Sequence, residues 1–191
     1  MQGSVGLENI RVYLYIRGFD RETLFPFLAE FSDLSVTSTD GDYVCLSMKN
    51  ETGKEEINHL REKMVEELYQ DFVAFIEPNS PNFDTSLVVA IMPKLSAGVY
   101  KVTEIIPPVV LKNLTGVKQY LKDYYYWLCG IETIETALGF AEAGLNATKA
   151  SQSLYMHRNT LNYRLDNFTK TTGIDIRTFA GAYALYLLYK S

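Results

Sequence analysis

Residues 146–173, NATKASQSLYMHRNTLNYRLDNFTKTTG, decide the fold of the second half of this chain. Their pattern predicts two short amphipathic helices joined by a tight turn. The second helix, expected over 157–170, carries Leu161, Leu165 and Phe168 at the i, i+4, i+7 spacing of one buried stripe. Its opposite face opens with polar side chains. This combination predicts a helix-turn-helix, which presents its second helix to the major groove of DNA.

The polar face of the second helix has the chemistry of a surface that reads DNA. Arginine pairs with guanine or phosphate, asparagine both donates to and accepts from adenine, and threonine contacts the thymine methyl group. A lysine on the first helix is placed to meet a phosphate. We therefore expect the DNA-binding residues to be Lys149, Arg158, Asn159, Thr160, Asn162, Tyr163 and Arg164. An ordinary solvated helix face is the alternative.

Several residues of this segment have a second interpretation. Arg164 lies about 60° from the apolar stripe, so a structural ion pair suits it as well as a phosphate does. His157 is expected to start the helix or pack, and Asp166 on the outer face would repel phosphate. Ser151 is expected to face the second helix, where alanine is usual. Tyr155 stands in the turn where glycine is preferred, and a non-glycine residue with positive φ is strained there, which leaves open a turn of different shape.

The phrase LYMHRNTLNYRL at 154–165, followed by Thr172-Gly173-Ile174-Asp175, closely resembles the C-terminal helix-turn-helix of the PucR/CdaR family of bacterial transcriptional regulators. A weaker likeness is to the Fis-type recognition helix. The PucR/CdaR resemblance covers 131–189 and implies a regulator that binds double-stranded DNA. A single helix-turn-helix with few positive charges binds one half-site weakly, so we expect a homodimer. A small-molecule effector, if there is one, is not identified by the sequence.

The first half of the chain alternates strand and helix patterns. Strands are predicted at 10–16, 34–39, 43–48 and 72–77, and helices at 21–31 and 54–70. The apolar run 87–92 fits a strand or a buried helix. From residue 115 onward only helical periodicity appears, at 116–129, 131–143, 147–154, 157–170 and 177–189. The last helix is apolar nearly all round, so it is expected to be buried behind the recognition helix, with an oligomer contact as the alternative.

These patterns predict an α+β chain with two domains. Residues 1–114 are expected to form a sandwich-like α/β domain for signalling or dimerisation. Residues 115–191 are expected to form the all-α helix-turn-helix domain. The strand order and hairpin of the first domain resemble the degenerate, GGDEF-like nucleotide-cyclase domain that often precedes this helix-turn-helix in the family.

The segment Asp40-Gly41-Asp42-Tyr43 sits where a diguanylate cyclase hairpin carries GGDEF. Here the first glycine is replaced by Asp40 and the final acidic residue by Tyr43, which removes a carboxylate that metal-assisted phosphoryl transfer requires. A tight turn alone explains the segment. No Walker A, HExxH, GxSxG or paired Cys/His spacing occurs. We therefore expect no enzyme activity, no catalytic residue, no metal site and no cofactor.

Composition and charge agree with a globular regulator. The net charge is −5 over 191 residues, of which 47% are hydrophobic. Residues 146–191 hold six Lys/Arg against two Asp, a balance of +4, and 1–145 hold 12 against 21, or −9. Cys45 and Cys129 are expected to be reduced and buried. With neither an export signal nor an apolar run of roughly 20 residues, a cytoplasmic protein without a membrane span is expected.

A second function remains open from the sequence. The acidic body and Tyr155 in the turn would also suit a protein–protein or metabolite-binding module, as would the expected lack of the further N-terminal sensing region that is common in the family. In that alternative the helix-turn-helix no longer binds DNA.

Overall fold

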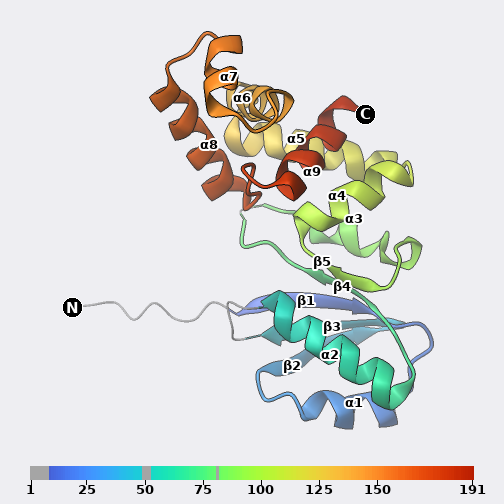
Figure 1. Ribbon diagram of the computed structural model, residues 1–191. Coiled ribbons are helices and arrows are strands. Elements are labelled where there is room, and N and C mark those ends of the chain that lie inside the picture. The colour runs from blue at the N-terminus through green and yellow to red at the C-terminus, as the bar shows by residue number, and fades with distance from the viewer. Residues whose placement is uncertain (1–8, 49–52, 81) are drawn as a thin grey trace. The chain divides into compact units, whose positions relative to one another are not determined.

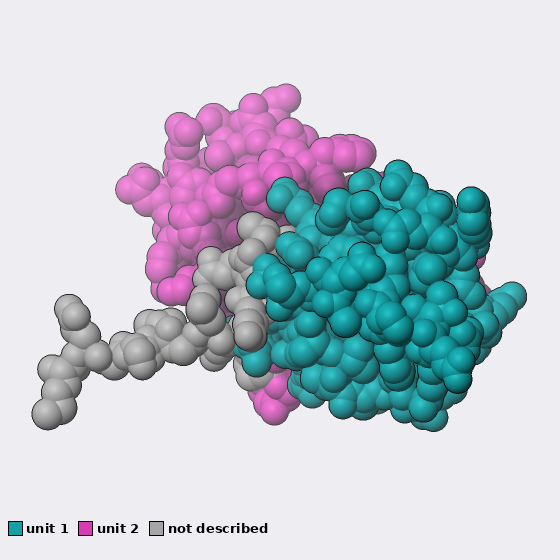
Figure 2. Space-filling view, turned by 90° about the horizontal axis from the view of Figure 1, so that it is seen from below, with its two compact units in different colours: residues 1–79, 84–101 teal, residues 80–83, 102–191 magenta. Residues whose placement is uncertain are grey.

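The computed structural model describes residues 9–48, 53–80 and 82–191. Contacts within the chain divide it into two compact units, shown in teal and magenta in Figure 2. Unit 1 comprises residues 1–79 and 84–101, and unit 2 comprises residues 80–83 and 102–191. The division falls earlier than the expected boundary at residue 114, because a helix that the sequence did not predict, Val102–Leu111, packs within unit 2.

Unit 1 is built on one five-stranded sheet (Figure 1). Its elements are β1 (Ile10–Tyr15), α1 (Arg21–Ala29), β2 (Leu34–Asp40), β3 (Tyr43–Met48), α2 (Gly53–Leu68), β4 (Val73–Ile76), α3 (Thr85–Val89), the 3-10 helix η1 (Met92–Lys94) and β5 (Gly98–Tyr100). The strand order is β2-β3-β1-β4-β5, antiparallel except for the β4–β5 pair. The first six elements form a split βαββαβ arrangement. The expected α+β class is confirmed.

The core of unit 1 lies between one face of the sheet and the helices α1 and α2. Alternate strand residues point to this face, as the two-residue period of a strand requires. The fully buried members from the strands are Val12, Leu14, Leu46, Met48 and Ala74, and those from α2 are Ile57, Leu60 and Met64. Asp20 caps α1, because its carboxylate accepts from the backbone amides of Glu22 and Thr23.

The β2–β3 hairpin forms at the predicted turn. Gly41 has φ +55°, a conformation that favours glycine. The Asp42 carboxylate accepts a 2.9 Å hydrogen bond from the Gly18 amide, which ties the turn to the loop after β1. Further along β2, a bulge lies between Val36 and Ser38. The hydroxyl of Thr37, inside the bulge, donates to the Cys45 carbonyl at 3.0 Å.

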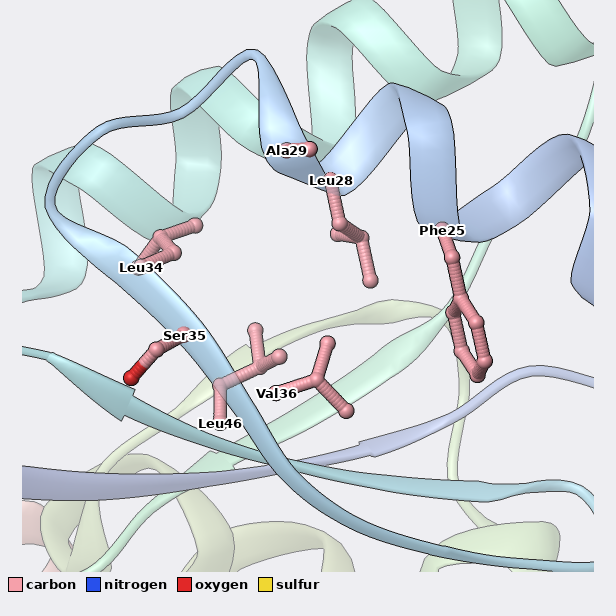
Figure 3. Close-up of a pocket in the computed structure, with 7 residues that line it drawn as sticks. All are labelled: Phe25, Leu28, Ala29, Leu34, Ser35, Val36 and Leu46. Carbon is pink, nitrogen blue, oxygen red and sulfur yellow. The ribbon is translucent and has the colours of Figure 1, made fainter.

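A small apolar hollow lies at the edge of unit 1 between α1 and β2 (Figure 3). Its volume is about 210 Å³. It is lined by Phe25, Leu28, Ala29, Leu34, Ser35, Val36 and Leu46. Ser35 supplies the one side-chain polar atom among these residues, so the hollow holds little that would orient a polar ligand.

Three local features of unit 1 differ from or refine the expectations. The ambiguous run 87–92 is not a strand: it contains the end of α3, a turn at residues 90–91 and the first residue of η1. The three-residue strand β5 was not predicted. Cys45 is a free, half-buried thiol and not a buried one, and the same holds for Cys129 in unit 2.

The regular elements described in unit 2 are all helices. It contains α4 (Val102–Leu111), α5 (Thr115–Cys129), α6 (Ile131–Glu142), α7 (Ala147–Ser153), α8 (Arg158–Thr172) and α9 (Phe179–Lys190). The five helices predicted from the sequence are all present, with ends that agree to within about two residues. Among the described helices, none combines the length and the apolar character needed to cross a membrane.

The last helix is only partly buried, which corrects the expectation from its composition. Gly181, Leu185 and Leu188 are buried, and α9 packs on α4, with further contacts to α6 and α5. The ring of Phe179 is 78% exposed and stacks on Tyr183 at a centroid distance of 5.7 Å. The two rings therefore stack on each other at the surface and do not enter the core. In addition, α9 packs chiefly on α4 and not behind α8.

Candidate nucleic-acid interface

The helices α6, α7 and α8 form a three-helix frame in which each helix contacts the other two. Asn146 caps α7, because its side-chain oxygen accepts from the amides of Thr148 at 3.0 Å and Lys149 at 3.1 Å. The buried small residue of α7 is Ala150. Ser151, which the sequence placed in that role, is half-buried and donates its hydroxyl to the Thr148 carbonyl. The buried small residue of α7 is therefore an alanine, as is usual, and Ser151 does not replace it.

The turn between α7 and α8 keeps the form that glycine would give it. The Tyr155 amide donates to the Gln152 carbonyl and the Met156 amide to the Ser151 carbonyl, at 3.2 and 3.0 Å. This bond pair defines the Schellman motif, in which the residue after the helix takes the left-handed conformation. Tyr155 does so, with φ +51°. The turn therefore does not change shape to suit tyrosine, and the strain expected for a non-glycine residue is present.

The start of α8 is fixed by His157. Its Nδ1 accepts a hydrogen bond from the Asn159 amide at 3.2 Å, so His157 is the N-cap of α8, as expected for a helix-starting residue. Leu161, Leu165 and Phe168 are buried, which confirms the predicted stripe. The opposite face of α8 is thereby directed away from the core of unit 2.

Five of the seven predicted DNA-binding residues lie on α8 outside its buried stripe, and a sixth, Lys149, lies on α7. Arg158, Asn159, Thr160 and Tyr163 are exposed on the first turns of α8, Asn162 is half-buried beside them, and Lys149 is exposed on α7. Within the described part of the chain, none of these six side chains has a hydrogen bond or an ion pair. The donors and acceptors of this face are therefore available to a ligand.

The seventh residue, Arg164, is engaged inside the domain. Its guanidinium donates to the Glu132 carboxylate at 2.9 Å and to the Thr136 hydroxyl at 3.2 Å, both on α6. The Thr136 hydroxyl in turn donates to the Glu132 carbonyl at 2.7 Å. Arg164 thus ties α8 to α6, which favours the structural alternative for this residue.

The charges on and around α8 are compatible with the binding of an anion. Asp166, which alone would repel phosphate, pairs with Arg177 at 2.8 Å. Unit 2 carries nine Lys/Arg against seven Asp/Glu, a net charge of +2, whereas unit 1 carries nine against sixteen, or −7. Clusters able to hold a metal ion are absent from the described residues.

Sequence reasoning missed Glu132, Thr136 and Arg177. Their partners lie on α8, but Glu132 and Thr136 precede it by about 30 residues, and no local pattern links positions so far apart. For Arg177 a weak signal existed: Asp175 accepts from the Arg177 amide at 3.0 Å, a turn that Asp commonly forms with the residue two positions on. That turn directs the chain toward α9.

The frame, its tight turn and its outward polar helix define a helix-turn-helix domain. Residues 133–190 match the PucR C-terminal helix-turn-helix domain family. This part of the chain is a PucR-type C-terminal domain, so the resemblance that the motif indicated is confirmed.

Two curated relatives from Bacillus subtilis (strain 168) match part of this chain. The chain is 41% identical over 49 residues to the uncharacterized protein YxkF, covering 26% of this chain and 16% of that protein. It is 35% identical over 75 residues to the DNA-binding transcriptional activator AdeR, covering 39% of this chain and 17% of AdeR. The matches thus span about a sixth of each relative's length.

A solved structure resembles the fold over most of the chain. It is the regulator of polyketide synthase expression from Bifidobacterium adolescentis, with a TM-score of 0.51 and 17% sequence identity. The similarity covers 94% of this chain and 78% of that one. At this level of identity the likeness concerns the fold.

Proposed function

We propose that this protein is a transcriptional regulator of the PucR/CdaR type that binds duplex DNA with α8 in the major groove. The observation that carries the proposal is the outward face of α8, whose first turns hold polar side chains without partners in the described part of the chain. The PucR-type domain supports it, as does the relative AdeR, which is named a DNA-binding transcriptional activator.

The proposed contacts divide by chemistry. Arg158, Asn159 and Thr160 stand at the N-terminal end of α8, the part of a recognition helix that meets base edges. Lys149, Asn162 and Tyr163 are assigned to phosphates or to the rim of the groove. Arg164 supports the interface by holding α8 on α6, as its bonds to Glu132 and Thr136 indicate.

Unit 1 is assigned to dimerisation or signalling and not to DNA. Its net charge of −7 disfavours contact with phosphate. Its βαββαβ order is compatible with a degenerate cyclase-like domain. The hairpin sequence gives no support to catalysis, because Asp40 and Tyr43 replace the glycine and the acidic residue of the cyclase motif. A homodimer follows from the single helix-turn-helix, since two half-sites are needed for firm binding.

The function is tested by selecting bound sequences from random duplex DNA and then measuring affinity for the selected site. Asn159→Ala should weaken binding by about 1–3 kcal/mol and relax base preference at one position, because an amide paired with adenine is lost. Asn167→Ala, the same change later in α8, is the control and should have little effect.

Two outcomes would count against the proposal. Equal affinity of the wild type and Asn159→Ala for the selected site would remove Asn159 from base recognition. No binding to any duplex, even at low salt, would favour a protein–protein or metabolite-binding module instead.

A further inference from the structure

Tyr155 is held in a backbone conformation that suits glycine. It follows Leu154, the C-cap of α7, and has φ +51°. The neighbouring helices of the same frame place glycine in this conformation at their ends: Gly144 after α6, with φ +69°, and Gly173 after α8, with φ +72°. A side chain with a Cβ is disfavoured there because the Cβ crowds the following carbonyl. The turn would form more easily with glycine in place of Tyr155.

The Tyr155 side chain does not offset this strain within the chain. It is 97% exposed, so it buries almost no apolar surface. Among the described residues, none exchanges a hydrogen bond with its hydroxyl. A strained residue that gains nothing from its own fold is a reason to look for a ligand outside the chain.

The position of Tyr155 indicates what that ligand is. The residue lies in the turn that leads into α8, two positions before the capping His157 and three before Arg158. A side chain that projects from this turn stands beside the end of α8 that is proposed to enter the groove. Tyrosine hydroxyls are among the groups that donate to DNA phosphates.

We propose that Tyr155 is a further DNA-contacting residue whose phenolic hydroxyl donates a hydrogen bond to a backbone phosphate flanking the groove. This inference rests on the proposed function. As a neutral donor, Tyr155 fixes the position of α8 on the duplex without releasing a counterion. Its loss therefore weakens binding to every sequence equally and leaves the salt dependence unchanged.

The chain contains a matched control in Tyr69. It follows α2 in unit 1, has φ +54° and is 91% exposed. Its residue type, backbone conformation and exposure are thus nearly those of Tyr155, but it stands in the acidic unit and away from the helix-turn-helix sequence. Strain and exposure alone therefore do not assign a DNA contact, and the comparison isolates the effect of position.

The experiment uses the full chain with Tyr155→Phe, Tyr155→Gly, Tyr69→Phe and Tyr69→Gly. Affinity for the selected duplex and for an unrelated duplex is measured by fluorescence anisotropy over a range of salt concentrations, and thermal unfolding is recorded for each variant. Both Tyr155 variants should bind either duplex roughly tenfold more weakly with an unchanged salt slope, as expected for one hydrogen bond to a charged group. Both glycine variants should unfold a few degrees higher, since glycine relieves the strain.

The two readouts move in opposite directions for Tyr155→Gly, so loss of folding cannot imitate the expected result. Wild-type affinity in both Tyr155 variants, with Asn159→Ala still weakened, would overturn this inference and leave the proposed function standing; it would also direct attention to a protein partner for Tyr155. Equal weakening by the Tyr69 variants would overturn it as well. A wild type that binds no duplex would overturn both the inference and the function.

Discussion

Gly181 occupies a position after α8 where the backbone leaves no room for a side chain. It lies in the first turn of α9, and a Cβ added there would overlap the backbone carbonyl of Asp175. The same turn is closed by Thr178, whose hydroxyl accepts from the Gly181 amide at 3.1 Å and donates to the Asp175 carbonyl at 2.7 Å. Because Gly181 and the Asp175 carbonyl are both held by this hydrogen-bonded turn, the two backbone segments have little freedom to move apart.

Gly181→Ala should lower the free energy of unfolding by about 1–3 kcal/mol, because the overlap is with backbone and not with a flexible side chain. Urea denaturation measures the change. Gly116→Ala is the control: it is also in a first helical turn, with no neighbouring atom within 4 Å of an added Cβ, and should be neutral or slightly stabilising. Similar losses for both variants would show that Gly181 is not sterically required.

At the scale of elements, α2 is joined to the segment just before β4 by a two-bond ion pair. The Arg61 guanidinium donates to both Asp71 carboxylate oxygens at 2.6 Å. These bonds, together with the Phe72 amide, hold the pKa of Asp71 below its ordinary value. A carboxylate with a depressed pKa in the folded state stabilises that state above its unfolded pKa of about 4. The contribution is lost as the pH falls through the lower folded value.

Asp71→Asn should therefore reduce the loss of unit 1 stability between about pH 4 and pH 2. The pair is about one-third exposed, so solvent screens it and the difference should be under about 1 kcal/mol. Urea midpoints measured across this pH range test it, and a repeat at high salt should shrink the difference further. If the urea midpoints of the wild type and the variant fell equally with decreasing pH, the ion pair would not contribute to the stability of unit 1.

At the scale of the whole molecule, two units of opposite net charge share one chain. The charge of +2 on unit 2 against −7 on unit 1 directs a polyanion toward the helix-turn-helix. Under the proposed function, one such domain would supply few phosphate contacts. A second copy would double them and would impose two-fold symmetry on the DNA site.

We expect two chains to bind each selected duplex, with half-sites about 10 base pairs or a multiple apart, centre to centre. Inserting roughly 5 base pairs between the half-sites turns one of them to the opposite side of the helix and should weaken binding strongly. Sedimentation of the complex gives the stoichiometry. A single chain per duplex, with affinity indifferent to spacing, would exclude the dimer.

The parts of the fold that sequence reasoning predicted are those fixed by local chemistry. The turn at Gly41 and the stripe of Leu161, Leu165 and Phe168 each act over a few residues, and both are confirmed. The outward position of Asn159 follows from the same helical period. Whether that face contacts DNA stays a prediction.

The features that were missed depend on contacts between distant residues. Pro107 and Pro108 lack the amide that a helix interior needs, so their presence hid α4. The helix forms because Val102, Ile105, Ile106 and Val109 make one buried stripe. Strand β5 is too short for a two-residue period to show, and it exists through its parallel pairing with β4. Likewise, the engagement of Arg164 depends on Glu132 in another helix.

The bulge in β2 has a consequence for how the protein behaves at high concentration. β2 is the outermost strand of its sheet and, over 34–40, has neither lysine nor proline to discourage an incoming strand. The irregularity at Val36 and Ser38 breaks the even spacing of backbone groups that a stacked fibril would copy. The bulge therefore makes edge-to-edge pairing between the sheets of two copies less favourable at high protein concentration.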